Sequence, residues 1–504
     1  MKCNHTIILL MFWLLPNSLF SQTNNIQLPT SFNEDGNVPD QSAILDVQSD
    51  QQGVLIPRMT YSQISQIANP AEGLMVYDTE FKCLRLFIGN TWDCLYQAKS
   101  DPKDIGDITG WTVLYSGELD PIESEMNSAD DLVVLGHLED GHGMYLSTFD
   151  KSGSLIWEEY TVGREGFALT TDQSNNIYIA GTINNSSGFL SKFDQDGNLI
   201  WDTMLGFNFE PQSLEIDQNG NIYLAGISLT SLTIANQAYN NYGSYDAYLV
   251  KMDGLGNIEW SSHFGGGGRD EIADIVIGSQ NDIHIAGNFA TDFYPPNASV
   301  PVTSSSGAYH LTFDSDGSHT FNYFSSAQDF QIHDILMNDL SELVWVANGT
   351  DEFTYGNQVV NIAGGSEEYL IVGLISNTSG VSIKGRSRTD FNFWRNSIRS
   401  LQLDQDNNMF IDVDPNSGSF VGDFDFNECP AEHVLLKYNY NFQGGSILNY
   451  EWAYPVKQVL RDFDRASTGE FFFTVQAYGS ELIGNTLFNE ENEPTIGIVK
   501  YLRQ

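Results

Sequence analysis

One short strand-like pattern recurs along most of this chain, and it constrains the fold more than any other feature of the sequence. Mostly apolar runs, each introduced by a polar residue, return at intervals of roughly 45 to 65 residues. The seven runs are DLVVLG (131–136), NIYIAG (176–181), NIYLAG (221–226), DIHIAG (282–287), ELVWVANG (342–349), NNMFIDV (407–413) and EFFFTV (470–475).

The segments between these runs indicate what each repeat folds into. After most runs comes a second strand-like stretch, an acidic turn and a third stretch, as in FLSKFDQDGNLIW (189–201) and AYLVKMDGLGNIEW (247–260). No helical periodicity is present, and about four strands per repeat is the pattern of propeller blades. The sequence therefore predicts an all-β fold, a seven-bladed β-propeller over residues 111–504.

The two ends of the repeat region predict a closed ring. The last repeat supplies EFFFTV (470–475) and TIGIVKYL (495–502) without an outer strand, while WTVLYSG (111–117) precedes the first repeat. We expect residues 111–117 to complete the last blade, because closure removes an open sheet edge.

The chain before the repeats divides into four segments. Residues 1–21 predict a signal peptide, because Lys2 precedes an apolar stretch too short for a bilayer core, which needs roughly 20 residues. Residues 22–42 read as a flexible leader, 43–97 as a small, mostly-β module and 98–110 as a linker. We therefore expect a secreted protein, extracellular or at the cell surface with the periplasm as the alternative, and no membrane insertion.

The module over residues 43–97 carries three recognisable segments, GVLIPRM (53–59), GLMVYDT (73–79) and FIGNTW (87–92). On these segments it resembles an N-terminal region that recurs in secreted and tail-fibre-like bacterial proteins. Related fibre segments lie at trimer interfaces, so the resemblance implies a homo-oligomer formed through this module. A simple spacer is the alternative, since so small a module buries little surface alone.

The charge of the chain excludes two classes of partner. Its formal net charge is −44, from 66 acidic and 22 basic side chains. Such a field repels phosphate backbones and anionic lipid headgroups, so neither nucleic acid nor bare membrane is expected as a partner. The acidity serves either solubility outside the cell or attraction of cations.

Three cysteines remain after the signal peptide. Cys83 and Cys94 flank LRLFIGNTWD, an apolar stretch with a GN turn near its middle, so a hairpin would bring them close. We predict a disulfide between Cys83 and Cys94, which export permits, and a buried thiol at Cys429. Cysteines this sparse do not indicate a zinc site.

The third repeat carries a second resemblance. Its segment GSYDAYLVKMDGLGNIEWSSHFGGGGRDEIADIVIGSQNDIHIAGNF (243–289) is similar to the seven-bladed propeller repeat of secreted bacterial proteins. That family implies a cell-surface or extracellular role, and it supplies no catalytic residues to transfer. The similarity weakens in the other repeats.

Several acidic turns are candidates for calcium sites. DQDG (194–197) and DSDG (314–317) pair carboxylates two residues apart but lack the further oxygens of a calcium loop, so we interpret them as hairpin turns. The best metal candidate is the loop GDFDFNE, with Asp423, Asp425 and Glu428. No cofactor is expected, with calcium at this loop as the one cation considered.

Two other motifs read as structural. The glycine run Gly265–Gly268 before Arg269 is followed by a strand-like segment rather than a helix, so it predicts a turn and not a phosphate loop. Trp157, Trp201 and Trp260 recur at one place in successive repeats, which favours packing between blades in the core over a sugar-binding platform.

No catalytic residue is predicted. His137, His142, His284 and His333 are spread over different repeats, and no nucleophile or metalloprotease motif is present. We therefore expect a non-enzymatic protein that binds a glycan or a protein through inserted loops around 228–245, 291–307, 351–367 and 414–432. The alternatives are a polysaccharide hydrolase or lyase with histidines and carboxylates at the central channel, and a structural spacer in a surface assembly.

Overall fold

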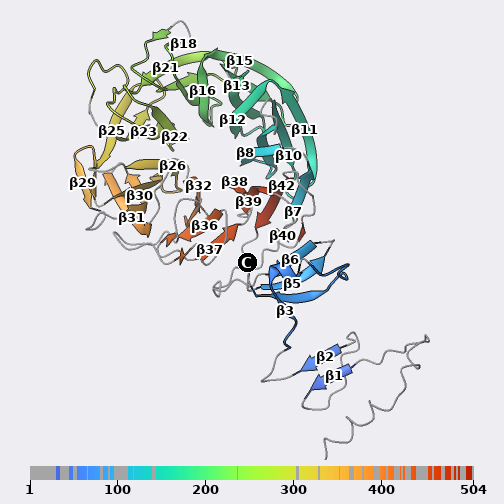
Figure 1. Ribbon diagram of the computed structural model, residues 1–504. Coiled ribbons are helices and arrows are strands. Elements are labelled where there is room, and N and C mark those ends of the chain that lie inside the picture. Colours follow the sequence, from blue (N-terminus) through green and yellow to red (C-terminus); the bar gives the residue numbers. More distant parts are fainter. Residues whose placement is uncertain are drawn as a thin grey trace, which may run out of the picture. The chain divides into compact units, whose positions relative to one another are not determined.

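The computed structural model divides the chain into two compact units, Met1–Ala98 and Lys99–Gln504 (Figure 1). The structure describes residues 30–33, 45–48, 54–64, 66–79, 83–88, 91–95, 112–116, 119–138, 143–184, 186–234, 237–301, 306–326, 330–350, 352–361, 368–376, 380–389, 398–403, 407–413, 420–421, 424–425, 433–438, 452–456, 459–466, 471–477, 482–483, 486–487 and 495–501. Among them, no helix is long and apolar enough to cross a bilayer.

The first unit is a small, mostly-β module. A parallel pair is formed by β1 (Thr30–Asn33) and β2 (Leu45–Gln48). The larger sheet has the order β3 (Arg58–Met59), β4 (Met75–Asp78), β5 (Cys83–Ile88) and β6 (Thr91–Leu95), with the short helix α1 (Tyr61–Ile64) after β3.

Local chemistry explains where α1 begins. The side chain of Thr60 accepts the N–H of Gln63, and the amide oxygen of Gln63 accepts the N–H of Thr60, which is a reciprocal helix cap. Ile64, Val76 and Phe87 are buried and form the small core of the described part of this unit.

The second unit is a ring of seven blades, each a sheet of four or more antiparallel strands (Figure 1). The first three blades comprise β8 (Leu119–Met126), β9 (Leu132–Leu138), β10 (Gly143–Phe149) and β11 (Leu155–Val162); β12 (Arg164–Thr171), β13 (Ile177–Ile183), β14 (Ser187–Phe193) and β15 (Leu199–Phe207); and β16 (Phe209–Ile216), β17 (Ile222–Ser228), β20 (Asp246–Met252) and β21 (Ile258–Phe264).

The remaining blades continue this order around the ring. They comprise β22 (Asp270–Ile277), β23 (Ile283–Phe289), β24 (Gly307–Phe313) and β25 (His319–Ser326); β26 (Gln331–Met337), β27 (Leu343–Thr350), β30 (Glu368–Ser376) and β31 (Gly380–Thr389); β32 (Ile398–Leu403), β33 (Met409–Val413), β36 (His433–Tyr438) and β37 (Trp452–Val456); and β38 (Val459–Arg465), β39 (Phe471–Ala477), β42 (Thr495–Tyr501) and β7 (Thr112–Ser116).

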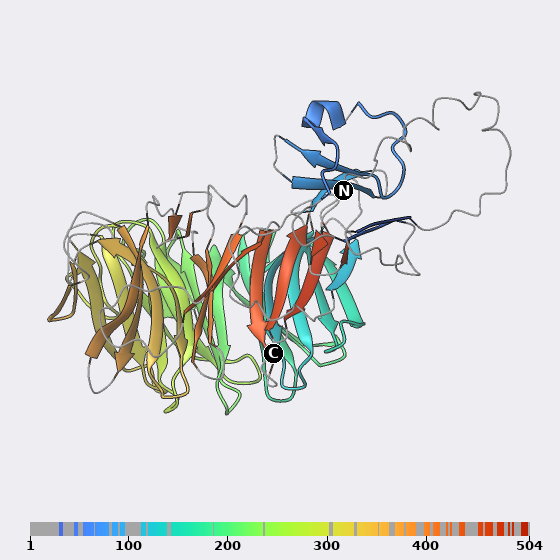
Figure 2. The same ribbon diagram turned by 90° about the horizontal axis from the view of Figure 1, so that it is seen from below.

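The seven recurring sequence runs are the second strands of the seven blades, as predicted. The first strand of each blade contacts the first strands of its neighbours, so these strands surround the axis. The expected closure is confirmed, because β7 pairs antiparallel with β42 through the register Leu114↔Gly497. The strands of each blade stand side by side when the ring is viewed from below (Figure 2).

Burial follows the position of each strand within its blade. Every residue of the middle strands β10 and β20 is buried, because adjacent blades cover both faces of the sheet. The outer strand β11 is largely exposed. The apolar clusters accordingly lie between successive blades, as where Tyr223 and Leu249 of blade 3 pack with Ile285 and Leu311 of blade 4.

Hairpins inserted in blades 3, 5 and 6 contact or extend the sheet of the preceding blade. Between β17 and β20, β18 (Leu232–Ile234) and β19 (Gln237–Tyr239) form a hairpin that contacts β15. β28 (Glu352–Tyr355) and β29 (Gln358–Asn361) extend the sheet of blade 4, and β34 (Phe420–Val421) and β35 (Phe424–Asp425) extend that of blade 5. A further hairpin, β40 (Leu482–Ile483) with β41 (Thr486–Leu487), lies before β42.

Candidate functional site

A polar pocket lies between blades 4 and 5, where β22 connects to β23. Its volume is about 730 Å³, within the size range of small-ligand sites. Hydroxyl and amide side chains dominate its lining, and no lysine or arginine is among the described residues that form it. The lining side chains used below are Ser279, Gln280, Asp282, His284, His310, Thr312, Asn322, Tyr355 and Asn357.

A chain of hydrogen bonds forms one wall of this pocket. Asp282 Oδ2 lies 3.0 Å from His284 Nε2, and His284 Nδ1 lies 3.1 Å from His310 Nε2. His310 Nδ1 lies 2.7 Å from the hydroxyl of Tyr355. The two imidazole rings are stacked, with centroids 5.3 Å apart. The wall therefore links blade 4 to the hairpin inserted from blade 5.

The register of the strands explains this contact between residues far apart in sequence. On adjacent strands β23 and β24, His284 pairs with Thr312 and Ala286 pairs with His310. Alternate residues of a strand share a face, so the two histidines lie diagonally across one face of blade 4. Tyr355 joins them because β28 adds to the edge of β25.

Burial keeps two members of this wall uncharged. Burial, followed by the nearby His284, lowers the pKa of His310 to about 3. It also raises the pKa of Tyr355 above its usual value. Asp282 has a lowered pKa, because His284 bonds to its carboxylate. At neutral pH, His310 and Tyr355 therefore act as hydrogen-bonding groups rather than as charges.

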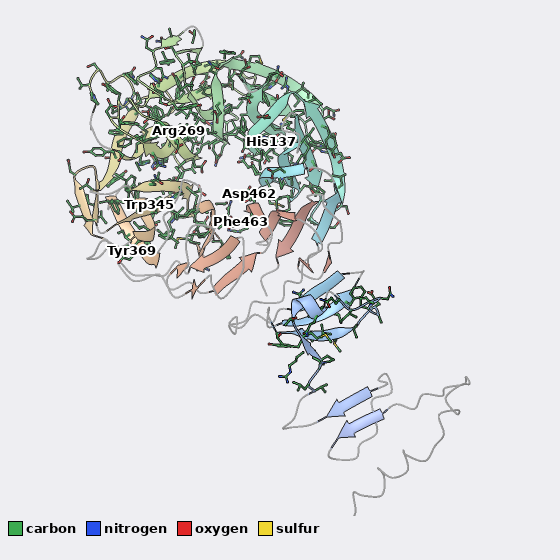
Figure 3. The ribbon with its side chains drawn as sticks, viewed as in Figure 1. His137, Arg269, Trp345, Tyr369, Asp462 and Phe463 are labelled. Carbon is green, nitrogen blue, oxygen red and sulfur yellow. The ribbon has the colours of Figure 1, made fainter. Side chains whose placement is uncertain are left out.

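A second group of titratable side chains lines the axis of the ring. Each first strand has a register shift, and in blades 1, 4, 5 and 7 the residue after the shift is acidic. Glu123 accepts the N–H of Leu169, Asp334 that of Leu401 and Asp462 that of Ser124. Each bond crosses to the next blade, and Figure 3 places Asp462 on the inner side of blade 7.

These carboxyl groups hold protons more tightly than ordinary carboxyls. Burial is the main cause, followed for Glu123 by repulsion from Asp462 and for Asp334 by repulsion from Asp274. The pKa of Glu215 is raised to about 8 and that of Asp462 to about 7. The axis is thus lined by carboxyl groups whose charge depends on pH.

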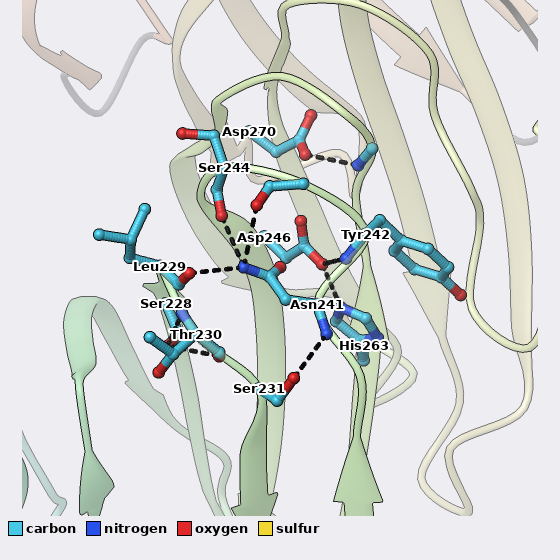
Figure 4. A network of polar contacts seen from close by, with 12 residues as sticks. Ser228, Leu229, Thr230, Ser231, Asn241, Tyr242, Ser244, Asp246, His263 and Asp270 are labelled. Atoms are coloured by element: carbon cyan, nitrogen blue, oxygen red, sulfur yellow. Dashed lines mark hydrogen bonds and ion pairs between the residues drawn. The ribbon is translucent and has the colours of Figure 1, made fainter.

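The glycine run is a turn between strands, as predicted, and it is followed by β22 rather than by a helix. Its N–H groups bind the chain's own carboxylates. Gly266 donates to Asp270 at 2.6 Å (Figure 4), and Gly267 donates to Asp292 at 2.7 Å. Since those donors are occupied, the turn does not offer a cradle for phosphate.

The three repeated tryptophans pack between blades, as predicted, but they are half-buried rather than fully inside the core. Each ring lies against the glycine of the acidic turn in the next blade. Trp157 meets Gly197, Trp201 meets Gly256 and Trp260 meets Gly317. Trp157 Nε1 and Trp260 Nε1 also donate to backbone carbonyls of those turns, at 2.8 and 3.1 Å.

The acidic turns are structural in the way expected. Asp194 Oδ1 accepts the backbone N–H groups of Asp196 and Asn198, and Ser318 donates to Asp316 Oδ1. Gly197 and Gly317 have positive φ angles of 82° and 85°, which glycine adopts without steric cost. The carboxylates are therefore used within their own turns.

Several predicted site residues are not tested by the structure. Of the metal candidates, Asp423 and Glu428 lie outside the described residues, and Asp425 is described only as part of β35. The register pairs Cys94 with Arg85 and Cys83 with Asp78, and neither cysteine side chain is described, so the disulfide stays a prediction. Cys429 lies outside the described residues.

Of the four histidines that the sequence places in different repeats, the three that the structure describes do not come together, but one of them, His284, lies beside a further histidine. His137 Nε2 lies 2.8 Å from the carbonyl oxygen of Gly166, and His333 Nε2 lies 2.7 Å from Asn348 Oδ1. His142 lies outside the described residues. His284, however, contacts His310, a residue for which the sequence predicts no role. The pair lies in the pocket between blades and not at the axis.

The sequence held a weak signal for this pocket. Asp282 directly precedes β23 and lies two residues before His284, and His310 and Thr312 alternate on β24, so the two residues of each pair are spaced to face the same way. That signal does not reveal Tyr355, because its position depends on how the inserted hairpin docks. The sequence did not reveal the carboxylates at the axis, because a single acidic residue in an apolar strand looks like an ordinary solvent-facing polar residue.

Comparison with known proteins gives one family match. Residues 34–109 match the family model described as a phage tail like trimerisation region. No curated protein matches the chain. The described part of the chain contains no group of three or more His, Cys, Asp or Glu side chains arranged to hold an ion.

Solved structures similar to the chain are distant. A protein of unknown function from Bacteroides caccae is 11% identical, with a TM-score of 0.33, covering 63% of this chain and 90% of its own. The Dos1 propeller is 7% identical, with a TM-score of 0.40 and coverage of 79% and 96%. A polysaccharide lyase described as an ulvan lyase is 10% identical, with a TM-score of 0.38 and coverage of 73% and 88%. At these identities and TM-scores, none of the three descriptions can be transferred to this chain.

Proposed function

We propose that this protein is an exported, non-enzymatic binding protein whose propeller binds a neutral glycan in the pocket between blades 4 and 5. The observation that carries the proposal is the lining of that pocket. Ser279, Gln280, Thr312, Asn322 and Asn357 offer hydroxyl and amide groups, which can both donate to and accept from sugar hydroxyls.

Charge favours a neutral ligand over an acidic one. The described lining has no lysine or arginine, and its carboxylate, Asp282, is bonded to His284. The whole chain carries a net charge of −44, which repels polyanions at long range. An uncharged, hydroxyl-rich saccharide is therefore a better match than a uronate or a sulfated polymer.

Export and assembly complete the proposal. Residues 1–21 have the pattern of a signal peptide, which supports a secreted or surface location. The match of residues 34–109 to a trimerisation region supports assembly into a trimer. A trimer would present three pockets, so weak single-site affinities would combine on a repetitive polymer.

A second candidate is a lyase or hydrolase acting at the same pocket, favoured by the contact between His284 and His310. General acid–base catalysis works best when the catalytic pKa lies near the working pH. The lowered pKa of His310, about 3, and the raised pKa of Tyr355 both move away from neutrality. Binding is thus the better-supported function, and a structural spacer would not need such a pocket.

One experiment separates these functions. The mature protein would be titrated with neutral and acidic oligosaccharides by calorimetry, while the same samples are assayed for new reducing ends and for unsaturated products. We expect binding of a neutral saccharide without product. Gln280→Ala should weaken binding about tenfold, the cost of one or two hydrogen bonds to the ligand.

The matched control is Gln218→Ala. Gln218 occupies the corresponding turn of blade 3, between β16 and β17, and lies outside the pocket. It should leave affinity unchanged. If product is released and His310→Gln abolishes its release, the enzymatic function replaces the binding proposal. If Gln280→Ala and Gln218→Ala lose the same affinity for the saccharide, the pocket is not the binding site.

A further inference from the structure

The outer strand of blade 1, β11, lies on the outer edge of the ring (Figure 1). All eight of its residues are exposed or half-buried. Four of them are large apolar side chains: Leu155, Ile156, Tyr160 and Val162 are 37%, 49%, 46% and 82% exposed. Single exposed apolar residues are ordinary, but four on one strand mark a contact surface.

In the next four blades, an insertion from the following blade reaches the outer strand. Each insertion lies between the second and third strands of its own blade. The hairpin strand β18 contacts β15, and Tyr294 forms a bridge with Gly265 at the end of β21. β28 pairs with β25, and β34 pairs with β31. The outer strands of blades 2 to 5 are thus covered, at least in part, by the chain itself.

This cover buries apolar side chains of the outer strands. Phe264 of β21 is fully buried, with its ring centroid 6.3 Å from that of Phe293 in the insertion of blade 4. Phe324 of β25 is also fully buried, 4.6 Å from the ring of Tyr355 in the insertion of blade 5. An outer strand in this ring therefore packs its apolar residues when an insertion reaches it.

Blade 2 has no insertion that could cover β11. Its second strand ends at Ile183 and its third begins at Ser187, so only a short turn joins them. β11 pairs with β10 along one side, and no other described segment forms a backbone hydrogen bond with residues 155–162. The outer side of β11 is an open sheet edge, and such edges pair with a further strand.

Alternate residues of a strand share a face, which defines the surface that a further strand would meet. Glu158, Tyr160 and Val162 lie on one face of β11, and the hydroxyl of Tyr160 donates to Glu158 Oε2 at 3.0 Å. Glu159 lies on the other face with Trp157, the ring that packs on the turn of blade 2. Each face therefore combines apolar side chains with one exposed glutamate.

Charge distinguishes between two possible occupants of this edge. If a second copy of β11 paired antiparallel over the whole strand, Glu158 of one copy would lie directly opposite Glu159 of the other. Like charges in that position destabilise a sheet, and each chain already carries a net charge of −44. A strand with basic side chains would instead place opposite charges beside both glutamates.

We propose that β11 binds an extended segment of another protein, rich in apolar and basic residues, which adds to blade 1 as a further strand. Backbone hydrogen bonds supply the pairing, as in other cases of strand addition, and side chains on alternate positions supply the specificity. Apolar side chains of the partner cover Tyr160 and Val162, and its Lys or Arg residues lie beside Glu158 and Glu159. No residue of β11 lines the pocket between blades 4 and 5, so this site is independent of the proposed saccharide site.

The test uses a fluorescent peptide of alternating valine and lysine, as long as β11, with the full mature chain in about 0.15 M salt to limit non-specific attraction. We expect a saturable rise in fluorescence anisotropy. Binding should be about tenfold weaker when glutamate replaces lysine in the peptide, or when proline replaces a central valine, because proline lacks the N–H that strand pairing needs.

Hydrogen exchange locates the bound peptide. The peptide should slow the exchange of backbone amides in residues 155–162, because those on the open edge gain hydrogen bonds. Residues 319–326 of β25 serve as the internal control, since β28 already pairs with that strand. Their exchange should not change, and protection outside β11 would overturn the proposal.

A matched pair of variants tests the strand itself. Val162→Lys should weaken peptide binding about tenfold and leave the fold intact, because Val162 is exposed and a lysine on an edge strand opposes pairing. Leu255→Lys makes the same change of charge at a 75% exposed residue in a turn of blade 3, and it should bind as the wild type does.

Two other results would also overturn the proposal. One is equal affinity of Val162→Lys and the wild type for the valine–lysine peptide. The other is protection of residues 155–162 that increases with the concentration of the chain alone and disappears in Val162→Lys, because the occupant of the edge would then be a second copy.

Discussion

At the scale of single residues, the contact between a tryptophan and a turn glycine decides how adjacent blades meet. Gly197 combines a φ of 82° with a close neighbour: a methyl group there would lie 2.8 Å from the ring of Trp157. Gly220 has nearly the same φ, 80°, but nothing within 4 Å of that position. A substitution at Gly220 therefore measures the free-energy cost of the backbone conformation alone, and one at Gly197 measures that cost together with the cost of disturbed packing.

The first prediction compares alanine at these two glycines. Gly220→Ala should lose about 1 kcal/mol of unfolding free energy, the cost of a left-handed alanine. Gly197→Ala should lose a further ~1–3 kcal/mol, because the methyl group displaces the tryptophan ring. Urea titration of both variants measures the difference, and equal losses would mean that the Trp157 contact contributes little.

The same residues show what the sequence can and cannot reveal. The repeat spacing of Trp157, Trp201 and Trp260 predicted their contacts between blades, because equivalent positions in a ring meet equivalent partners. His284 and His310 form no such repeat, and Tyr355 reaches them only through an inserted hairpin that docks on another blade. Repeats specify a scaffold, whereas the pocket depends on departures from the repeat.

At the scale of strands, the first strands of the blades carry carboxyl groups that join one blade to the next. The pKa of Asp462 is raised to about 7 in the folded protein, against about 3.9 in an unfolded chain. Between these two values the folded state binds more protons. The stabilisation is therefore present at low pH and is lost as pH rises through about 7.

The second prediction follows from this sign. Unfolding free energy should fall between pH 5 and pH 8, and Asp462→Asn, which keeps an oxygen for the N–H of Ser124, should reduce that fall by about 1–2 kcal/mol. Asp253→Asn, at an exposed turn with a lowered pKa, should leave the fall unchanged over this range. An Asp462→Asn variant with the pH dependence of the wild type would contradict the assignment.

The third prediction concerns strand β7, which closes the ring. A truncated chain beginning at Glu118 lacks β7 and would leave β42 as an open edge, whereas one beginning at Lys99 retains it. Open edges pair with other chains. The shorter chain should unfold at lower temperature and form aggregates that light scattering detects. If the two chains behave alike, closure by β7 does not stabilise the ring.

At the scale of the whole molecule, the proposed function assigns assembly to the first unit and binding to the second. In the first unit, the side chains of Val54 and Leu55 are 65% and 76% exposed, and that of Met75, the first residue of β4, is 47% exposed. So much exposed apolar surface on a small module marks a contact surface. Since residues 34–109 match a trimerisation region, the expected occupant is another copy of this chain.

The fourth prediction tests whether other copies of this chain cover these exposed apolar side chains. The mature chain should be a trimer by light scattering coupled to size exclusion, and the chain beginning at Lys99 should be a monomer with unchanged affinity for the saccharide in solution. Leu55→Asp places a charge on the expected contact surface, so it should produce monomers that still fold, because Leu55 is not part of the buried core of its unit. Binding to an immobilised polymer should fall by about a hundredfold in both cases, since three linked pockets act together and one does not.

A monomeric wild type would leave the exposed residues without a role in assembly, and a trimeric Leu55→Asp variant would move the contact to another part of the unit.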